Sequence, residues 1–138
     1  MTEALCQASR RGVRVVILTP GSRTDSQAVR RASKKRWGRL LAAGVRLYEY
    51  QPAMLHTKRM IVDGLFVSVG SANFDPRSLR INDEANLNVI DPDFARRETR
   101  LFAADLRRSL PVHGDDNPLS ELLDASLGLI ETPIESQL

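Results

Sequence analysis

Four polar side chains between residues 56 and 73 are of the types that act on a phosphodiester. They are His56 and Lys58, two residues apart, and Ser71 and Asn73 further along the chain. An imidazole can attack phosphorus or transfer a proton near neutral pH, and an ammonium with neutral donors can hold non-bridging oxygens as charge builds in the transition state. If the fold brings the four together, we expect phosphodiester chemistry that needs no metal and no cofactor.

A β-hairpin is predicted between these residues. The pair Asp63-Gly64 separates two apolar runs, and it favours a two-residue type I′ turn because both central residues of that turn need positive φ. With those two residues as the turn, Val62 pairs with Leu65. Asp63 is therefore interpreted as a turn residue, because seven residues of strand at roughly 3.3 Å each hold it about 23 Å from His56.

The same pairing predicts which side chains share a face of the hairpin. His56 lies opposite Ser71, Met54 lies opposite Asn73, and Lys58 stands two residues from His56 on the same strand. Residues two apart point to the same face of a strand, and directly opposite residues share that face. We therefore expect His56, Lys58, Ser71 and Asn73 to converge at one end of the hairpin.

The rest of the chain predicts an α/β framework around this hairpin. Three consecutive segments predict a right-handed crossover between parallel strands. They are a β-branched apolar run that ends at Pro20-Gly21, a helix that ends at Gly44, and an alternating run after it. Asp91 followed by Pro92 predicts a helix start. In chain order, we expect the end of a helix at 3–11, a strand at 13–18, a helix at 26–43, a strand at 45–50, the hairpin, a strand at 84–90, a helix from 92 to about 110, a polar linker and an imperfect apolar helical stripe at 119–130.

Composition limits the kind of protein that this sequence encodes. With 138 residues, 42% of them hydrophobic and 27% charged, the chain has the composition of one globular domain. No window approaches the roughly 18 apolar residues of a membrane span, and the N-terminus lacks the layout of a signal peptide. Cys6 is the single cysteine, which excludes an internal disulfide, and no cluster of residues has the spacing of zinc ligands.

Charge is distributed unevenly along the chain. Residues 1–60 hold 13 basic and 3 acidic residues, a net charge of +10, whereas residues 61–138 hold 7 basic and 14 acidic residues, a net charge of −7. The basic half predicts a surface for an anionic partner, either phospholipid headgroups or a nucleic acid. The alternative interpretation is a solvated basic face of one exposed helix.

The stretch HTKRMIVDGLFVSVGSANFDPRSLRINDEANL, residues 56–87, resembles the phospholipase D superfamily. Together with GVRVVILTPG and LLAAGVRLYEYQPAMLH before it, the run is similar to the bacterial cardiolipin synthase branch over about residues 3 to 110. The resemblance implies an α/β fold in which a mixed sheet is sandwiched by helices. The matching positions are His56, Lys58 and Asp63 at the family's spacing, followed by Gly70, Ser71 and Asn73.

Carried over position by position, the resemblance implies a role for each matched residue. His56 takes part directly in phosphatidyl transfer, and Lys58 contacts the phosphate. Ser71 and Asn73 hold phosphate oxygens or order the site. Glu84 matches an acid that hydrogen-bonds a catalytic imidazole, which is either His56 or a partner histidine. The resemblance implies no metal and no cofactor.

The sequence departs from the family pattern in having one His-x-Lys motif, where family members build an active site from two. His113 has no lysine two residues later and is interpreted as a linker residue. The start of the sequence matches the end of the family's first helix. We therefore expect the C-terminal half of a two-motif enzyme, with the first strand missing; the alternative is a single-motif protein that forms a homodimer.

The predicted function is conversion of two phosphatidylglycerol molecules to cardiolipin and glycerol through a phosphohistidine. Two alternatives stay open: a phospholipase D or nuclease that uses water as the acceptor, and an inactive fragment or binding module. The expected partners are anionic phospholipid and the second motif, with nucleic acid less favoured. We expect a peripheral protein on the cytoplasmic side of the bacterial membrane, with a catalytic domain at 1–110 and a linker and tail at 111–138.

Overall fold

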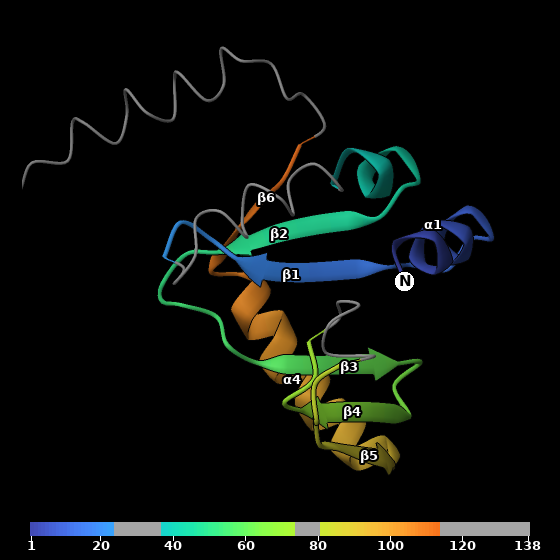
Figure 1. Ribbon diagram of the computed structural model, residues 1–138, viewed down its shortest axis with the longest axis vertical. Helices are drawn as coiled ribbons and strands as arrows, with labels where there is room; N and C mark the ends of the chain where they lie inside the picture. The colour runs from blue at the N-terminus through green and yellow to red at the C-terminus, as the bar shows by residue number, and fades with distance from the viewer. Residues whose placement is uncertain (24–36, 74–80, 114–138) are drawn as a thin grey trace, which may run out of the picture.

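The structure, a computed structural model, describes residues 1–23, 37–73 and 81–113. The described strands form two three-stranded sheets that lie edge to edge, and one long helix contacts both sheets (Figure 1). This arrangement confirms the predicted mixed α/β fold. The elements are α1 (Thr2–Arg10), β1 (Val16–Pro20), β2 (Arg46–Tyr50), β3 (Lys58–Val62), β4 (Phe66–Gly70), β5 (Asn86–Ile90), α4 (Pro92–Leu106) and β6 (Ser109–Pro111).

The first sheet has the strand order β1-β2-β6. β1 and β2 are parallel, as predicted from the crossover between them, and their register runs from Val16 opposite Arg46 to Pro20 opposite Tyr50. The pair ends at Gly21, whose backbone N–H donates to the Tyr50 carbonyl at 3.1 Å. A Cβ at Gly21 would collide with that carbonyl oxygen, so only glycine allows this close approach.

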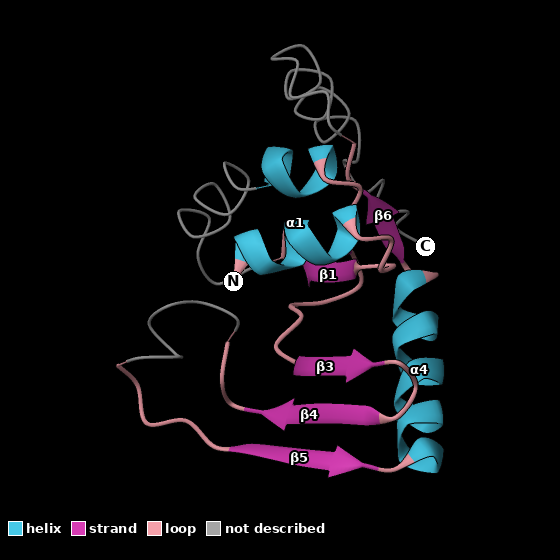
Figure 2. Cartoon of the chain, turned by 90° about the vertical axis from the view of Figure 1, so that its right-hand side faces the viewer, coloured by secondary structure: helices cyan, strands magenta, loops and turns pink. Residues whose placement is uncertain are grey.

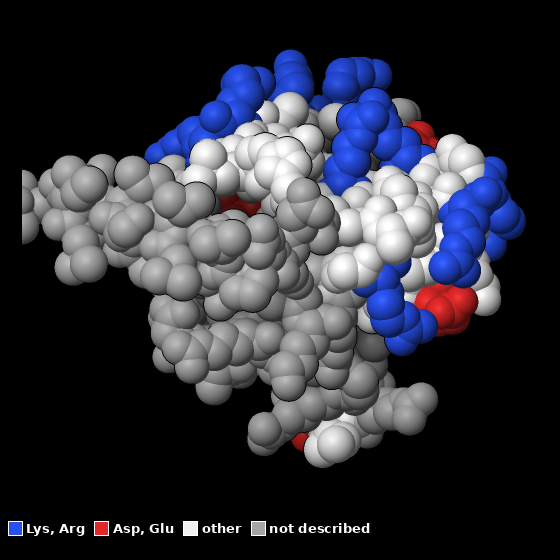
Figure 3. Space-filling model, turned by 90° about the horizontal axis from the view of Figure 1, so that it is seen from above, with Lys and Arg blue, Asp and Glu red and all other residues white. Residues whose placement is uncertain are grey.

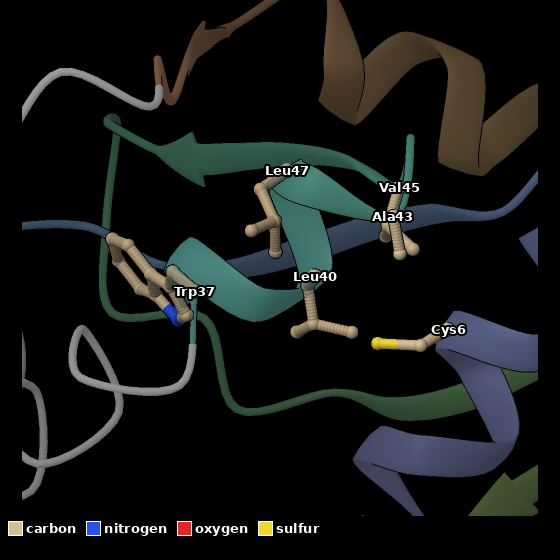
Figure 4. Close-up of a cluster of buried hydrophobic side chains, with 6 residues drawn as sticks. All are labelled: Cys6, Trp37, Leu40, Ala43, Val45 and Leu47. Carbon is tan, nitrogen blue, oxygen red and sulfur yellow. The ribbon is translucent and has the colours of Figure 1, made fainter.

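A small apolar core lies between this sheet and the helical segments beside it. Cys6 from α1 and Leu40 from the helical segment 37–42 point toward one another in this core (Figure 4). Cys6 is 1% exposed and its sulfur lies 3.6 Å from the carbonyl oxygen of Arg39, so this cysteine acts as a small packed side chain. The buried members of the core are Cys6, Trp37, Leu40, Ala43, Val45 and Leu47.

The second sheet is antiparallel throughout and has the order β3-β4-β5. α4 follows β5 directly. Its N-cap is Asp91, which accepts a hydrogen bond from the Phe94 backbone N–H at 2.6 Å, and Pro92 occupies the first helical turn. Figure 2 shows α4 crossing the ends of these strands toward the first sheet. The helix therefore holds the two sheets together.

The predicted end of this helix, at about residue 110, is wrong. α4 ends at Leu106, and Ser109–Pro111 forms β6, which pairs antiparallel with β2. Val112 continues the contact, because its backbone N–H donates to the Leu47 carbonyl at 2.9 Å. This pairing gives hydrogen-bond partners to the backbone groups on the outer edge of β2. A strand of three residues is too short to show an alternating pattern in the sequence, so it was not predicted.

The predicted register of the hairpin is wrong by one residue. Asp63 and Gly64 have φ of 51° and 64°, and the Leu65 N–H donates to the Val62 carbonyl at 3.0 Å, so the predicted turn is confirmed. However, Val62 pairs with Phe66 rather than with Leu65. Leu65 is an extra residue between turn and strand, and its carbonyl accepts a hydrogen bond from Asp91 at 3.0 Å.

Three predicted segments lie wholly or partly outside the described residues. These are most of the basic helix at 26–43, the turn at Pro76 and the tail from 114 onward. Trp37, at the described end of the basic helix, is 7% exposed and belongs to the core. The domain boundary at residue 110 stays a prediction.

Candidate active site

His56 and Lys58 contact one another directly at the start of β3. The Lys58 Nζ lies 2.9 Å from His56 Nε2 and donates to the His56 carbonyl oxygen, also at 2.9 Å. An ammonium has only donors, so Nε2 is the acceptor whenever a charged Lys58 makes this contact. The imidazole is exposed, which leaves it open to a substrate.

Lys58 lies at the same end of the second sheet as Ser71 and Glu84. It pairs with Gly70, and Gly70 pairs with Asn86 on the next strand. Ser71 follows Gly70 directly, and Glu84 lies two residues before Asn86. The structure therefore brings the chemical part of the motif and the Gly-Ser segment to one end of the sheet.

The exact side-chain pairs that we predicted are wrong. Because Lys58 lies opposite Gly70 instead of Val69, the register places neither His56 opposite Ser71 nor Met54 opposite Asn73. The extra residue at Leu65 is the cause, since a shift of one residue in an antiparallel pair moves every later partner. His56 and Asn73 both lie beyond the regular strands, where the alternation of faces no longer places their side chains.

Ser71 is held by the segment that leads into β5. Its backbone N–H donates to the Ala85 carbonyl at 3.0 Å, and the Ala85 N–H donates to Ser71 Oγ at 3.0 Å. These two hydrogen bonds hold Ala85, which follows Glu84, beside Ser71, which follows Gly70. Glu84 itself accepts a hydrogen bond from the Asn82 amide at 3.2 Å.

Asp63 lies away from this end of the sheet. It occupies the turn after β3, whereas His56 precedes β3, so the five residues of the strand separate the two. Asp63 is exposed and has a positive φ, which Asp tolerates better than most residues. The structure thus supports the interpretation of Asp63 as a turn residue.

Comparison with known proteins shows which family this chain belongs to. The family described as "Cardiolipin synthase, PLD-like domain" matches residues 1–106. The chain belongs to this family of enzymes. Cardiolipin synthase 2 of Bacillus cereus is 41% identical over 112 residues, which cover 81% of this chain and 22% of that protein. Cardiolipin synthase A of Escherichia coli K12 is 40% identical over 129 residues, which cover 94% of this chain and 24% of that protein.

The PLD-like domain described here thus spans less than a quarter of the length of these curated relatives. Its fold also matches a solved structure of a phospholipase D family member, Nuc from Salmonella typhimurium. The match has a TM-score of 0.70 at 24% identity and covers 81% of this chain and 72% of that one. Across the described residues, no helix is long and apolar enough to cross a membrane.

Asn86 is a residue of the domain's site that the sequence analysis missed. Its side-chain oxygen accepts a hydrogen bond from the Ala72 N–H at 3.2 Å, and its side-chain nitrogen donates to Ser68 Oγ at 3.3 Å. A Cβ at Gly70 would collide with Asn86 Oδ1, so glycine at that position makes room for this amide. An asparagine within a predicted strand, where amides are disfavoured, was the available signal.

Arg59 is a second missed residue, and it orients the motif. Its guanidinium pairs with Glu98 at 2.8 Å and with Asp105 at 3.5 Å on α4, and it lies 5.9 Å from the centroid of the Phe102 ring. The Arg59 side chain is 11% exposed and that of Glu98 is 15% exposed. Because neighbouring residues of a strand point to opposite faces, this anchor on α4 directs Lys58 to the other face of the sheet.

Replacing Asn86 by alanine is expected to loosen the backbone after Gly70. The two hydrogen bonds contribute about 1 kcal/mol each, so the free energy of unfolding falls by roughly 1–2 kcal/mol. The exchange rate of the Ala72 amide, measured by NMR, should rise. Asn88→Ala is the matched control, because Asn88 is an exposed asparagine on the same strand. Equal Ala72 exchange rates in the two variants would contradict this role.

Proposed function

We propose that this domain supplies one histidine motif to a phosphatidyltransferase that makes cardiolipin and glycerol from two molecules of phosphatidylglycerol. The observation that carries the proposal is the contact between Lys58 Nζ and His56 Nε2 beside the Gly-Ser segment. Within a cardiolipin synthase family, this pair combines a nitrogen able to attack or protonate with a cation able to hold a phosphate oxygen.

The proposed reaction has two displacement steps. A histidine nitrogen attacks the phosphorus of one phosphatidylglycerol, a nitrogen–phosphorus bond forms, and the bond to the headgroup glycerol breaks. A second histidine gives the leaving glycerol its proton. A hydroxyl of the other lipid's headgroup then attacks phosphorus, loses its proton to that second histidine, and displaces the first histidine.

Two histidines are needed, and His56 supplies one of them. We propose that the other comes from a second motif in polypeptide outside this chain, with His56 as the general acid and base. In the alternative assembly, two copies of this chain each contribute a His56, and one of the two forms the phosphohistidine. Sedimentation of the active preparation distinguishes these two arrangements.

The test is a graft into a curated relative. The 129-residue matching stretch of Escherichia coli cardiolipin synthase A is replaced by the equivalent residues of this chain. The product is then incubated with phosphatidylglycerol vesicles. We expect cardiolipin and free glycerol in equal amounts. Phosphatidic acid instead of cardiolipin indicates a hydrolase, cut DNA in a parallel incubation indicates a nuclease, and no product with any substrate indicates a binding module.

We also propose that the domain works at an anionic membrane surface on the cytoplasmic side. Figure 3, viewed from the end that carries the first sheet, shows many Lys and Arg side chains and few acidic ones among the described residues. Glu3 pairs with Arg39 at 3.1 Å, which neutralises part of this charge. The exposed arginines of α1, of the loop after it, of segment 37–42 and of β2 are Arg10, Arg11, Arg14, Arg39 and Arg46.

The charge distribution predicts vesicle binding that depends on salt. The chain should sediment with phosphatidylglycerol vesicles at low ionic strength, because each basic residue near the surface contributes about 1 kcal/mol. Changing Arg11, Arg14 and Arg46 together to glutamine should reduce the bound fraction severalfold, as should raising the salt concentration. Arg96→Gln on α4, another exposed arginine, is the control. Equal binding to neutral vesicles would contradict the electrostatic explanation.

A further inference from the structure

The carboxyl ends of the two parallel strands lie on the same side of the protein as the start of β3. Figure 1 shows the arrowheads of β1 and β2 on the side where β3 begins. β4 runs antiparallel to β3, so Gly70 and the Gly-Ser segment lie there as well. Residues 51–57 connect β2 to β3 on this side. Side chains that follow β1 and β2 are therefore on the same side of the protein as His56 and Lys58.

Arg23, in the loop after β1, contacts the segment that leads to His56. Its Nη1 donates a hydrogen bond to the Pro52 carbonyl oxygen at 2.9 Å. Two residues before Arg23, the Gly21 N–H donates to the Tyr50 carbonyl at 3.1 Å. The chain that leaves β1 thus lies against the chain that leaves β2, and this pairing brings the Arg23 guanidinium to Pro52.

The Arg23 guanidinium can bind an anion while it contacts Pro52. Arg23 is exposed, and a guanidinium carries five N–H donors in a planar fork, of which the bond to Pro52 uses one. Pro52 offers a neutral carbonyl, and no carboxylate among the described residues forms an ion pair with Arg23. Arginine binds phosphate oxygens through two parallel hydrogen bonds. Arg23 therefore offers a positioned cation to a phosphate group.

The spacing between Pro52 and His56 is compatible with two phosphates joined by one glycerol. The four residues from Pro52 to His56 span at most about 14 Å when they are extended. The chain bends at Pro52 and Ala53, which shortens this span. Two phosphorus atoms joined through the three carbons of glycerol lie at most about 8 Å apart, since six bonds separate them. One phosphate at His56 and Lys58 and a second at Arg23 can therefore belong to one reaction complex.

The exposed residues between these two cationic groups are apolar. They are Ala53 and Met54, and Met54 is 48% exposed. An apolar surface suits the uncharged carbon bridge between the phosphates of two lipid headgroups. Binding of a single-stranded nucleic acid uses aromatic rings for stacking, and direct readout of its bases uses polar groups. Residues 53–55 carry neither, so this segment favours a lipid over a nucleic acid.

We propose that Arg23 binds the phosphate of the acceptor phosphatidylglycerol and thereby selects a lipid as the acceptor. This inference rests on the proposed function, in which His56 and Lys58 act at the donor phosphate. In the second step, the acceptor hydroxyl attacks the phosphorus of the phosphohistidine. An oxygen–phosphorus bond forms, the nitrogen–phosphorus bond breaks, and the proton passes to the histidine that acts as base.

The acceptor's own phosphate keeps its negative charge throughout this step. Arg23 holds that charge and so places the headgroup hydroxyl near the reacting phosphorus. Water and simple alcohols carry no phosphate, so Arg23 gives them no such advantage. The residue therefore favours transfer to a lipid over hydrolysis.

The first test compares two acceptors in the grafted cardiolipin synthase. Phosphatidylglycerol vesicles are incubated with a fixed concentration of ethanol, which competes as an acceptor and yields phosphatidylethanol. Arg23→Gln should lower the rate of cardiolipin formation about 10- to 100-fold, the effect of losing a charge-assisted hydrogen bond. The rate of phosphatidylethanol formation should stay within about threefold, because ethanol does not use Arg23.

Two further variants control this comparison. Arg23→Lys keeps the charge but loses the planar fork, so it should recover part of the cardiolipin rate. Arg96→Gln removes an exposed arginine from α4 and should change neither product.

The second test needs no enzymatic activity. Glycerophosphoglycerol, the soluble headgroup phosphodiester of phosphatidylglycerol, is added to the isotope-labelled chain, and NMR follows the Arg23 Nε–H and the His56 ring. Both signals should shift with saturation at millimolar concentration. Arg23→Gln should preserve the shift at His56, and Lys58→Gln should preserve the shift at Arg23, because the two phosphates bind at separate points. Glycerol, which has no phosphate, should shift neither signal.

Three results would overturn the proposal. Equal changes in cardiolipin and phosphatidylethanol formation in Arg23→Gln would show that Arg23 only supports the segment before His56. An Arg23 signal that glycerophosphoglycerol does not shift would show that no headgroup binds there. Tighter binding of the dinucleotide thymidylyl-thymidine at Arg23 would assign the site to a nucleic acid. If the graft makes no product from any substrate, the proposed function fails, and the NMR titration still decides whether Arg23 binds the headgroup.

Discussion

Replacing His56 by alanine in the grafted cardiolipin synthase is expected to lower the rate of cardiolipin formation by about 100- to 10,000-fold, the range of general acid–base catalysis. The loss follows because the variant lacks the imidazole nitrogen that contacts Lys58. Product formation from phosphatidylglycerol vesicles, followed by chromatography of the lipids, measures the effect. The thermal unfolding midpoint should change little, because the His56 side chain is exposed.

His113→Ala is the matched control for this variant. His113 is the other histidine of the chain, it is exposed, and it follows the residue that ends the contact of β6 with β2. Its replacement should leave the rate of cardiolipin formation within about twofold of the unsubstituted graft, as for a surface residue outside the site. A His56→Ala enzyme as fast as the His113→Ala enzyme would refute the catalytic role of His56.

Replacing Glu98 by alanine is expected to cost about 3 kcal/mol of unfolding free energy, because it removes the closer partner of a nearly buried guanidinium. The value lies at the lower end of the range for a broken buried pair, since Asp105 remains 3.5 Å from Arg59. Urea denaturation of the domain measures the loss. The tilt of β3 on α4 should also change, and with it the position of Lys58.

Arg96→Ala is the control for an ion pair on the same helix. Arg96 and Asp93 form an exposed i,i+3 pair, with 65% and 81% of the side chains exposed, so its loss should cost less than about 0.5 kcal/mol. The double variant Arg59→Met with Glu98→Leu should recover most of the stability lost in Glu98→Ala, because it leaves no unpaired buried charge. Similar losses for Glu98→Ala and Arg96→Ala would show that the Arg59 pair does not anchor β3.

The order of elements followed from local patterns in the sequence. The Asp63-Gly64 turn forms because the two residues tolerate positive φ, and Asp91 with Pro92 starts α4 because of its capping group. These are interactions between residues close in the chain, which sequence spacing describes well. The predicted parallel pair of β1 and β2 succeeded for a related reason, since a short crossover leaves few possible topologies.

Features that depend on distant residues escaped the same reasoning. The extra residue at Leu65 is held by Asp91 from the far end of β5, and β6 forms because β2 has an edge to pair. In the sequence, Arg59 was counted only as one of the basic residues of the positively charged segment 1–60. In the structure it pairs with Glu98 and Asp105 on α4. Each of these contacts joins residues more than twenty positions apart.

The sequence by itself determined the chemical groups of this protein and their family, because His56, Lys58 and the Gly-Ser segment are recognised by type and spacing. Only the tertiary structure decided how these groups are held. The amide of Asn86 beside Gly70 and the anchor of Arg59 on α4 depend on the register of three strands and the path of one helix. Register is set by pairing and packing between distant segments, and these interactions exist only once the chain has folded.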